Sequence, residues 1–527
     1  MKSILAAMLL LPAATFALDG QVGIHDPSTI IACDGKYYVY GTGGNPLVSD
    51  DGWTWRRGTT PLRTGAAPDV IHLGDRYFMY ISGVTMISSK SLDPESPDYK
   101  WEEGGKIAGY ESDGDFINPI DPGAFLDPND GKLWLTYGSY VGYIRLVQLD
   151  PKTGKRVDNT FYNLAINCEA SDMIYHDGWY YLLATHQSCC QGANSGYNIR
   201  MGRSRSVYGP YLDNMGVDMM QSGGKLFLTS TGRTIGPGHF GLLNCGDGVQ
   251  KFSIHWEADL DRGGASVLDI RPLLWQDGWP VAGENLKEGT YDIESTRTGT
   301  SLELAVEAVP VGGARNRGGG GGGFGGRGGR RGGPGAAGNT NAPGSRGGFA
   351  AAGDTNAPGG PPAFAGAGGT NAPGGRGGRG GFGGFGGQGG VIPPQDVAQV
   401  STNWPTGNID LRMANYMCQA QQKWAITAVT NAGGYPGSPY FKITIAGTDR
   451  ALAVNNEAEL VSLPAFSGGP EQLWRIDELA DGTWRIMPKS APNAKEPLAL
   501  SAAGSAFATL AAFNPDSDRQ RWFIKAP

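Results

Sequence analysis

The stretch Asp34-Gly35-Lys36-Tyr37-Tyr38 decides the fold, because its pattern recurs along the first half of the chain. A turn dipeptide leads directly into aromatic, strand-forming residues, which is a strong indication of a β-hairpin. The pattern returns at Gly74-Asp75-Arg76-Tyr77-Phe78, Asp130-Gly131-Lys132-Leu133-Trp134, Asp177-Gly178-Trp179-Tyr180-Tyr181 and, more weakly, at Gly246-Asp247-Gly248 before Lys251-Phe252-Ser253-Ile254. Recurrence at roughly 40 to 70 residues, without a helical period, predicts an all-β, five-bladed β-propeller. We assign it to residues 18–286.

The first 17 residues have the pattern of a secretory signal peptide. Lys2 precedes an apolar run over residues 4–12, and small residues lead to Ala17. Such a segment is removed on export, and the run is too short to span a bilayer. We therefore expect a secreted protein, extracellular or periplasmic, with no membrane partner. The formal net charge of −7 over 527 residues also argues against a nucleic-acid partner.

Six cysteines are few for an exported chain of this length, and most lie far apart. They do not form the spacing of a disulfide framework. Cys189 and Cys190 are adjacent, and two readings stay open for them. They form a vicinal disulfide, or they are two buried free thiols.

Three carboxylates precede expected inner strands of the propeller. Asp26 lies in Ile24-His25-Asp26-Pro27-Ser28, Asp121 in Asn118-Pro119-Ile120-Asp121-Pro122, and Glu169 in Asn167-Cys168-Glu169-Ala170-Ser171. Inner strands line one central channel, so these groups can converge there. Because proline restricts the preceding residue, we expect extended backbone at Asp26. Burial would raise the pKa of Glu169, as a general acid requires. Any one of these carboxylates alone could simply stabilise a turn or lie at the rim of the propeller. Three carboxylates at matching positions before inner strands favour a catalytic role.

Two carboxylates flanking a glycosidic bond perform glycoside hydrolysis. Asp26 in His-Asp-Pro-Ser, Asp121 in Ile-Asp-Pro and Glu169 in Glu-Ala-Ser resemble the triad of the five-bladed propeller glycoside hydrolases of family 43. Further stretches resemble the arabinanase branch of that family: Cys189-Cys190-Gln191-Gly192, Ser195-Gly196-Tyr197-Asn198, Gly236-Pro237-Gly238-His239 and Ile270-Arg271-Pro272-Leu273.

The resemblance implies hydrolysis of α-1,5-L-arabinan with inversion at the anomeric carbon. Asp26 would be the general base and Glu169 the general acid, while Asp121 would raise the pKa of Glu169 and orient it. Asn118 and Ser139 would contact the substrate. His239, with waters, would hold a calcium ion in the channel; without the family, a buried neutral histidine bonded to backbone is the alternative.

Other functions remain open on the same fold. An α-L-arabinofuranosidase or a β-xylosidase would use the same carboxylates, and the sequence leaves endo and exo action undecided. A non-catalytic carbohydrate-binding protein is the alternative outside the enzymes. The intact triad argues against that last reading.

Composition changes abruptly over residues 313–390. Glycine dominates, Arg-Gly-Gly recurs, and Thr-Asn-Ala-Pro-Gly repeats at Thr340, Thr355 and Thr370. Such a segment cannot bury a core, so we expect disorder. Arg-Gly-Gly with scattered phenylalanine can bind RNA, but in a secreted chain we favour a flexible loop that contacts acidic polysaccharide.

Three Gln-x-Trp motifs follow at regular intervals, in Gln422-Lys423-Trp424, Gln472-Leu473-Trp474 and Gln520-Arg521-Trp522. This threefold pattern resembles the ricin-type lectin β-trefoil, which implies that tryptophan fills the core and glutamine fixes a turn. The first repeat must begin near Gly289, so we assign the trefoil to residues 287–527, interrupted by residues 313–390. Glu303, Ala453 and Ala499 occupy the usual sugar-binding acid positions, so at most one repeat is equipped to bind carbohydrate.

Overall fold

The computed structural model describes residues 18–59, 63–116, 118–306 and 404–527. The predicted signal peptide (1–17) and the predicted disordered segment (313–390) therefore lie outside the described residues. Within the described ranges, every regular element is a β-strand or a three-residue 3-10 helix. None of the helices in these ranges is long and apolar enough to cross a membrane. The all-β prediction is confirmed.

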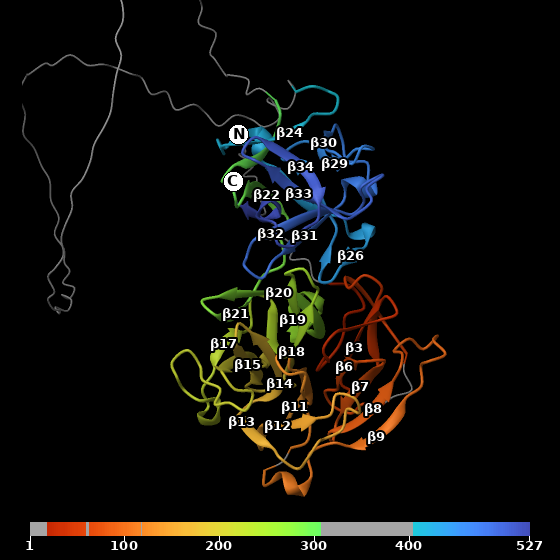
Figure 1. Ribbon diagram of the computed structural model, residues 1–527, viewed down its shortest axis with the longest axis vertical. Helices are drawn as coiled ribbons and strands as arrows, with labels where there is room; N and C mark the ends of the chain where they lie inside the picture. The colour runs from red at the N-terminus through yellow and green to blue at the C-terminus, as the bar shows by residue number, and fades with distance from the viewer. Residues whose placement is uncertain (1–17, 60–62, 117, 307–403) are drawn as a thin grey trace, which may run out of the picture. The chain divides into compact units, whose positions relative to one another are not determined.

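Five sheets follow one another in chain order, coloured from red to green in Figure 1. Blade 1 contains β1 (Asp19–Gly20), β2 (Ile31–Cys33), β3 (Lys36–Tyr40), β4 (Pro46–Ser49) and β5 (Thr54–Arg57). Blade 2 contains β6 (Asp69–Leu73), β7 (Arg76–Ile81), β8 (Thr85–Ser89) and β9 (Glu102–Lys106). Blade 3 contains β10 (Gly123–Leu126), β11 (Leu133–Tyr137), β12 (Tyr143–Leu149) and β13 (Tyr162–Ile166).

The last two blades have longer inner strands. Blade 4 contains β14 (Glu169–His176), β15 (Trp179–His186), β16 (Asn198–Ser204) and β17 (Lys225–Leu228). Blade 5 contains β18 (Thr234–Asn244), β19 (Gln250–Asp259), β20 (Ala265–Gln276) and β21 (Trp279–Ala282). Within each blade, consecutive strands pair antiparallel, while β1 joins the outer edge of blade 1 in parallel with β5. The predicted five-bladed propeller is confirmed.

The predicted turn dipeptides all lie in the first hairpin of a blade. Asp34-Gly35 joins β2 to β3, and Asp177-Gly178 joins β14 to β15. The φ angles of Asp34 and Asp177 are 50° and 47°, and the glycines that follow also have positive φ. Asp and Gly adopt this left-handed backbone more readily than other residues, which is why the dipeptide marks tight hairpins.

The propeller core lies between the facing surfaces of neighbouring blades. Blades 1 and 2, 2 and 3, and 3 and 4 each share a cluster of buried apolar side chains. The largest cluster joins Val39 of blade 1 to Ile199 of blade 4 and Ile254 of blade 5. Burial of apolar surface contributes roughly 25 cal/mol per Å², so each blade is stabilised by its neighbours and the ring closes as a unit.

The C-terminal region forms a twelve-stranded sheet arrangement. Its strands are β22 (Gly289–Ser295), β23 (Ser301–Leu304), β24 (Leu411–Ala414), β25 (Trp424–Ala428), β28 (Phe441–Ile445), β29 (Ala451–Val454), β30 (Leu460–Leu463), β31 (Trp474–Glu478), β32 (Trp484–Pro488), β33 (Leu498–Ala503), β34 (Phe507–Ala512) and β35 (Trp522–Lys525). A separate two-stranded pair is formed by β26 (Gly434–Tyr435) and β27 (Ser438–Pro439). Strand β22 pairs with β25 and β35, so the first repeat begins upstream of the glycine-rich segment, as predicted.

The three Gln-x-Trp motifs make the same contacts in each repeat. The indole N–H groups of Trp424, Trp474 and Trp522 donate to the carbonyls of Leu302, Leu452 and Leu500 at 2.8, 3.1 and 3.0 Å. All three tryptophans are fully buried. Each glutamine amide accepts one backbone N–H and donates to one backbone carbonyl of the preceding turn. The structural role predicted for these motifs is confirmed.

Candidate active site

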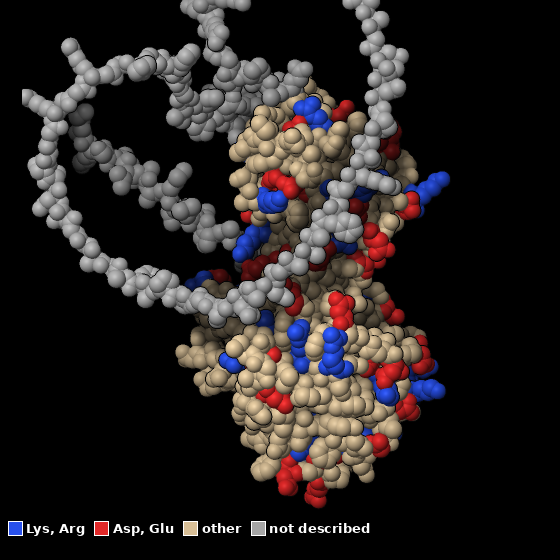
Figure 2. Space-filling view, turned by 60° about the vertical axis from the view of Figure 1, so that its left-hand side comes forward, with Lys and Arg blue, Asp and Glu red and all other residues tan. Residues whose placement is uncertain are grey.

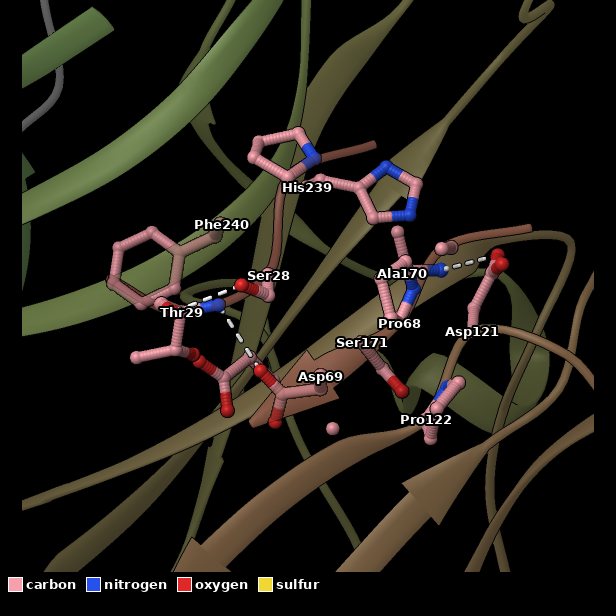
Figure 3. A pocket seen from close by; sticks show the side chains of 14 residues that line it. Ser28, Thr29, Pro68, Asp69, Asp121, Pro122, Ala170, Ser171, His239 and Phe240 are labelled. Atoms are coloured by element: carbon pink, nitrogen blue, oxygen red, sulfur yellow. Dashed lines mark hydrogen bonds between the residues drawn. The ribbon is translucent and has the colours of Figure 1, made fainter. Parts of the chain in front are cut away.

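The five blades place corresponding residues around one channel. Each blade contributes a non-glycine residue with positive φ that lies shortly before its innermost strand or, for Ala170 and His239, within that strand: Asp26 (50°), Ala67 (43°), Asp121 (54°), Ala170 (49°) and His239 (54°). Residues at or directly after these positions line a single pocket, seen in Figure 3. Backbone in this region costs of order 1–3 kcal/mol for such residues and clusters at functional sites. The shared Asp-Pro pairing correctly predicts that Asp26 and Asp121 are equivalent.

Asp26 is held by hydrogen-bond donors and imidazoles. Its Oδ2 accepts from the Thr42 hydroxyl at 2.6 Å and lies 2.8 Å from Nδ1 of His25. Its Oδ1 lies 3.2 Å from Nδ1 of His239. Its backbone N–H donates to Nδ1 of His255 at 2.7 Å. Burial alone would raise the pKa of the Asp26 carboxyl, but these imidazoles hold it well below its ordinary value.

The backbone of Asp26 differs from the sequence expectation. Its φ of 50° is left-handed, whereas the following proline predicts extended geometry. Aspartate tolerates this region better than most residues. The tertiary hydrogen bonds to His255 and Thr42 outweigh the local preference, so the prediction of extended backbone was wrong.

Glu169 is the first residue of β14 and is buried. The Ser139 hydroxyl donates to its Oε2 at 2.7 Å, and the Tyr197 phenol donates to its Oε1. Burial raises the pKa of Tyr197 strongly, and the charge of Glu169 adds to the effect, so the phenol stays protonated and remains a donor. Ser139, a predicted substrate contact, therefore lies against the predicted acid.

Asp121 is linked to Glu169 through backbone. Its Oδ2 accepts the N–H of Ala170 at 3.2 Å, the bond dashed in Figure 3. Burial raises the pKa of Asp121 well above its ordinary value, and the nearby charges of Glu169 and Asp26 raise it further. Like charges in one buried site resist simultaneous ionisation, which is why these neighbours oppose the ionisation of Asp121.

An open cleft adjoins Glu169. Its lining includes Tyr140, Asn167, Gln187, Ser188 and Cys189. Cys189 and Cys190 form a disulfide, and Cys190 is exposed, so the alternative of two buried free thiols is wrong. Asn118 is half-buried three residues before Asp121, and its carbonyl accepts the Ile120 N–H at 2.9 Å. Substrate contact by Asn118 stays a prediction.

His239 has the features of a metal ligand, whereas its neighbour His255 does not. Neither ring nitrogen of His239 has a hydrogen-bond partner among the described residues, and burial lowers its pKa, which keeps it neutral. Nδ1 of His255 already accepts the Asp26 N–H, so its lone pair is engaged. One imidazole and one carboxylate oxygen are a small ligand set for calcium, which takes six to eight oxygens. The residues fit a hydrated, weakly held ion.

Five contributors to the site escaped the sequence analysis: His25, Thr42, Tyr197, His255 and Glu257. His25 and Tyr197 belong to stretches that carry the family resemblance, so the resemblance could have indicated that they lie in the site. The other three belong to blades 1 and 5 or their connections and reach the site only when the ring closes. A single threonine, histidine or glutamate in a strand has no spacing that distinguishes it.

In the trefoil, the three residues at the expected sugar-binding positions have different surroundings. Ala453 and Ala499 are fully buried and offer no polar group. Glu303 is buried and accepts a 2.6 Å hydrogen bond from Nε of Arg412. Only the first repeat therefore presents an acid at this position.

The fold and the site together define a β-propeller glycosidase, with its carboxylates at the entries of the inner strands. Residues 40–280 match the family described as glycosyl hydrolases family 43, and residues 420–514 match the ricin-type beta-trefoil lectin domain-like family. The chain is 30% identical over 293 residues to an extracellular endo-alpha-(1->5)-L-arabinanase of Bacillus subtilis, covering 49% of this chain and 87% of that protein. It belongs to glycosyl hydrolases family 43.

Two further relatives are similar over the same half of the chain. An extracellular exo-alpha-(1->5)-L-arabinofuranosidase of Cellvibrio japonicus is 30% identical over 326 residues, covering 53% of this chain and 92% of that protein. A solved structure of Cellvibrio cellulosa alpha-L-arabinanase complexed with arabinohexaose is 26% identical, with a TM-score of 0.46, and covers 50% of this chain and 96% of that one.

Proposed function

We propose that this chain is a secreted glycosidase that cleaves α-1,5-L-arabinan with inversion at the anomeric carbon. The observation that carries the proposal is the different environment of two carboxylates, both of which lie close enough to Asp121 to raise its pKa. Asp26 is surrounded by imidazoles that favour its charged form. Glu169 is buried, held by two hydroxyl groups and linked through Ala170 to a second acid. Two carboxyl groups in such different surroundings can take the separate roles of base and acid.

Asp26 acts as the general base. Its Oδ2 is occupied by Thr42 and His25, which leaves Oδ1 as the oxygen that accepts a proton from water. Holding one oxygen fixes the direction of the other. In this scheme Oδ1 takes a proton from a water molecule, and the water oxygen bonds to the anomeric carbon as the glycosidic bond breaks, which is the reaction of an inverting enzyme.

Glu169 acts as the general acid that protonates the departing sugar oxygen. Ser139 and Tyr197 hold its two oxygens, and these donors stabilise the carboxylate that remains after proton transfer. Asp121 orients the segment through its hydrogen bond from the Ala170 N–H. The adjoining cleft, lined by Tyr140 and Cys189, would receive the leaving part of the chain.

A metal ion belongs to the proposal as a secondary feature. His239 would hold a hydrated calcium ion, and the residues that line the channel around it would keep it in place. When bound, the ion would supply positive charge that opposes the repulsion between Asp26 and Asp121.

The names of similar proteins and the charge on the surface support the proposed substrate class and the proposed location outside the cell. The names of the Bacillus and Cellvibrio relatives include both endo and exo enzymes on α-1,5-linked arabinose, and both are called extracellular. On the face shown in Figure 2, acidic and basic side chains are interspersed, which suits a neutral polysaccharide better than a polyanion. The trefoil would bind carbohydrate through the first repeat, where Glu303 is the acid.

A chromatographic time course on debranched arabinan tests the proposal. Endo action gives a ladder of oligosaccharides at early times, whereas exo action gives one short product throughout. Release from aryl α-L-arabinofuranosides or aryl β-xylosides, with none from arabinan, would replace the proposal with an arabinofuranosidase or a β-xylosidase. Absence of release from all three substrates would favour a non-catalytic carbohydrate-binding protein.

A further inference from the structure

Glu257 is a buried carboxylate beside the general base, and the mechanism above gives it no role. It lies on β19, and its side chain is only 2% exposed. A Cβ at Gly236 on β18 would lie 2.9 Å from the Cβ of Glu257, so the neighbouring strand packs closely against it. A charge removed from water this completely must be compensated by its neighbours.

Three N–H groups face this carboxylate. Nε2 of His25 lies 3.1 Å from Oε1, and the backbone N–H of Cys190 donates to both carboxylate oxygens at 3.1 Å. Nε2 of His255 lies 3.8 Å from Oε1, too far for a direct hydrogen bond. Nε2 of His255 has no other partner among the residues described. Glu257 thus joins the two imidazoles around Asp26 to the disulfide segment.

The protonation states of the imidazoles follow from their partners. Nδ1 of His25 lies 2.8 Å from Oδ2 of Asp26, and Nε2 lies 3.1 Å from Oε1 of Glu257, so each ring nitrogen faces a carboxylate oxygen. His25 is therefore an imidazolium that donates from both nitrogens. His255 is neutral, because its Nδ1 accepts a hydrogen bond and therefore carries no proton. Since its Nδ1 accepts the Asp26 N–H, its proton lies on Nε2, facing Glu257.

This assignment has two consequences. A proton on Nε2 of His255 leaves no lone pair for a metal ion between His25, His255 and Glu257, although their ligand atoms lie close together. The backbone and the carboxylate of Asp26 are each held by an imidazole, and both imidazoles turn their second nitrogen toward Glu257. Without Glu257, the His25 ring would keep only its contact with Asp26 and could rotate about it.

We propose that Glu257 is a positioning residue for the general base, acting through His25 and His255 to keep Asp26 aimed at the attacking water. The proposal rests on the proposed function, because it assigns Asp26 the role of base. Glu257 touches no reacting atom in this scheme. Its contribution is a fixed orientation, and a misplacement of about 1 Å can cost on the order of 100-fold in rate.

The first test compares Glu257→Gln with Asp127→Asn, which removes the charge of a buried carboxylate that lies between β10 and β11 and accepts a hydrogen bond from the Tyr180 hydroxyl at 2.7 Å. On debranched arabinan, we expect Glu257→Gln to lower kcat about 10- to 100-fold with KM changed less than about twofold, because orientation acts in the transition state. Asp127→Asn should leave both constants near wild type. In a His25→Gln background, Glu257→Gln should cause little further loss, since the path through His25 is already broken.

The second test does not depend on activity. The chain has six histidines, so selective ¹⁵N-histidine labelling gives few signals. The wild-type spectrum should show His25 protonated on both nitrogens, and Glu257→Gln, but not Asp127→Asn, should shift the His25 signals. If Glu257→Gln does not fold, Glu257→Asp serves in both tests, because it keeps the charge while shortening the reach.

The outcomes separate the two proposals. An unchanged kcat, a loss that adds fully to that of His25→Gln, or unchanged His25 signals would overturn the role of Glu257. Failure of the wild-type protein to cleave arabinan or activated arabinosides would refute the proposed function. The histidine spectra would still decide whether Glu257 holds His25.

Discussion

Replacement of Tyr197 by phenylalanine removes one hydroxyl group from the general acid and leaves the ring in place. The phenol donates to Oε1 of Glu169 and is fully buried. A hydrogen bond to a charged group contributes about 1.5–3 kcal/mol, and 1.36 kcal/mol corresponds to tenfold in rate. Because the carboxylate develops as the proton leaves, most of this loss falls on the transition state. We therefore expect kcat to fall about 10- to 100-fold.

The matched control is Tyr211→Phe. Tyr211 is equally buried, but its hydroxyl donates to the Val207 carbonyl at 2.9 Å, away from the carboxylates. Initial rates on debranched arabinan and thermal unfolding by circular dichroism would be measured for both variants. Tyr211→Phe should lose about 1 kcal/mol of stability and Tyr197→Phe up to about 3 kcal/mol, but only Tyr197→Phe should lose turnover. On a substrate with an activated aryl leaving group the loss should shrink, because such a group departs with little protonation. A Tyr197→Phe enzyme with wild-type kcat on arabinan would refute the assigned role of the phenol.

Three further predictions follow from the same geometry. Glu169→Gln should lower turnover on arabinan by about 10²–10⁴-fold while calorimetry shows nearly unchanged substrate binding; wild-type turnover would remove Glu169 from the acid role. Removal of calcium by a chelator should lower activity partly without unfolding the protein. His239→Ala should show the same loss and should not respond to the chelator. A fully active His239→Ala variant, together with a wild-type protein whose activity the chelator does not change, would contradict the metal assignment. Burial raises the pKa of the Asp172 carboxyl, and the charge of Asp69 raises it further. The folded protein therefore binds the Asp172 proton more tightly than the unfolded chain does. The free energy of unfolding should fall as the pH rises above about 4, the ordinary pKa of aspartate. Asp172→Asn should flatten that fall in melting temperatures measured between about pH 4 and pH 8, and parallel curves would contradict it.

The fold was predictable because its determinants are local and repeated. Asp34-Gly35 and its counterparts specify the hairpin turns by themselves, and the tryptophans of the Gln-x-Trp motifs fill the same place in each trefoil repeat. The inner-strand entries were predictable for the same reason, since Asp26 and Asp121 share a dipeptide and a backbone conformation.

The surroundings of the carboxylates were not predictable, because they form only when distant blades meet. Glu257 lies 232 positions from His25, yet the two are hydrogen-bonded. The left-handed backbone of Asp26 likewise depends on His255, which belongs to the last blade. A local rule for residues before proline cannot include such a partner, so it failed at the base. The role expected for Asp121 toward Glu169 stays a prediction.

The central claim is that Asp26 and Glu169 hydrolyse arabinan by a single displacement through water. Proton NMR during the first minutes of hydrolysis of debranched arabinan reports the anomeric configuration of the released sugar before mutarotation. The account predicts that the β anomer appears first from the α-linked substrate, and that Glu169→Gln releases neither anomer at a comparable rate. Initial release of the α anomer, or hydrolysis by Glu169→Gln at the wild-type rate, would contradict it.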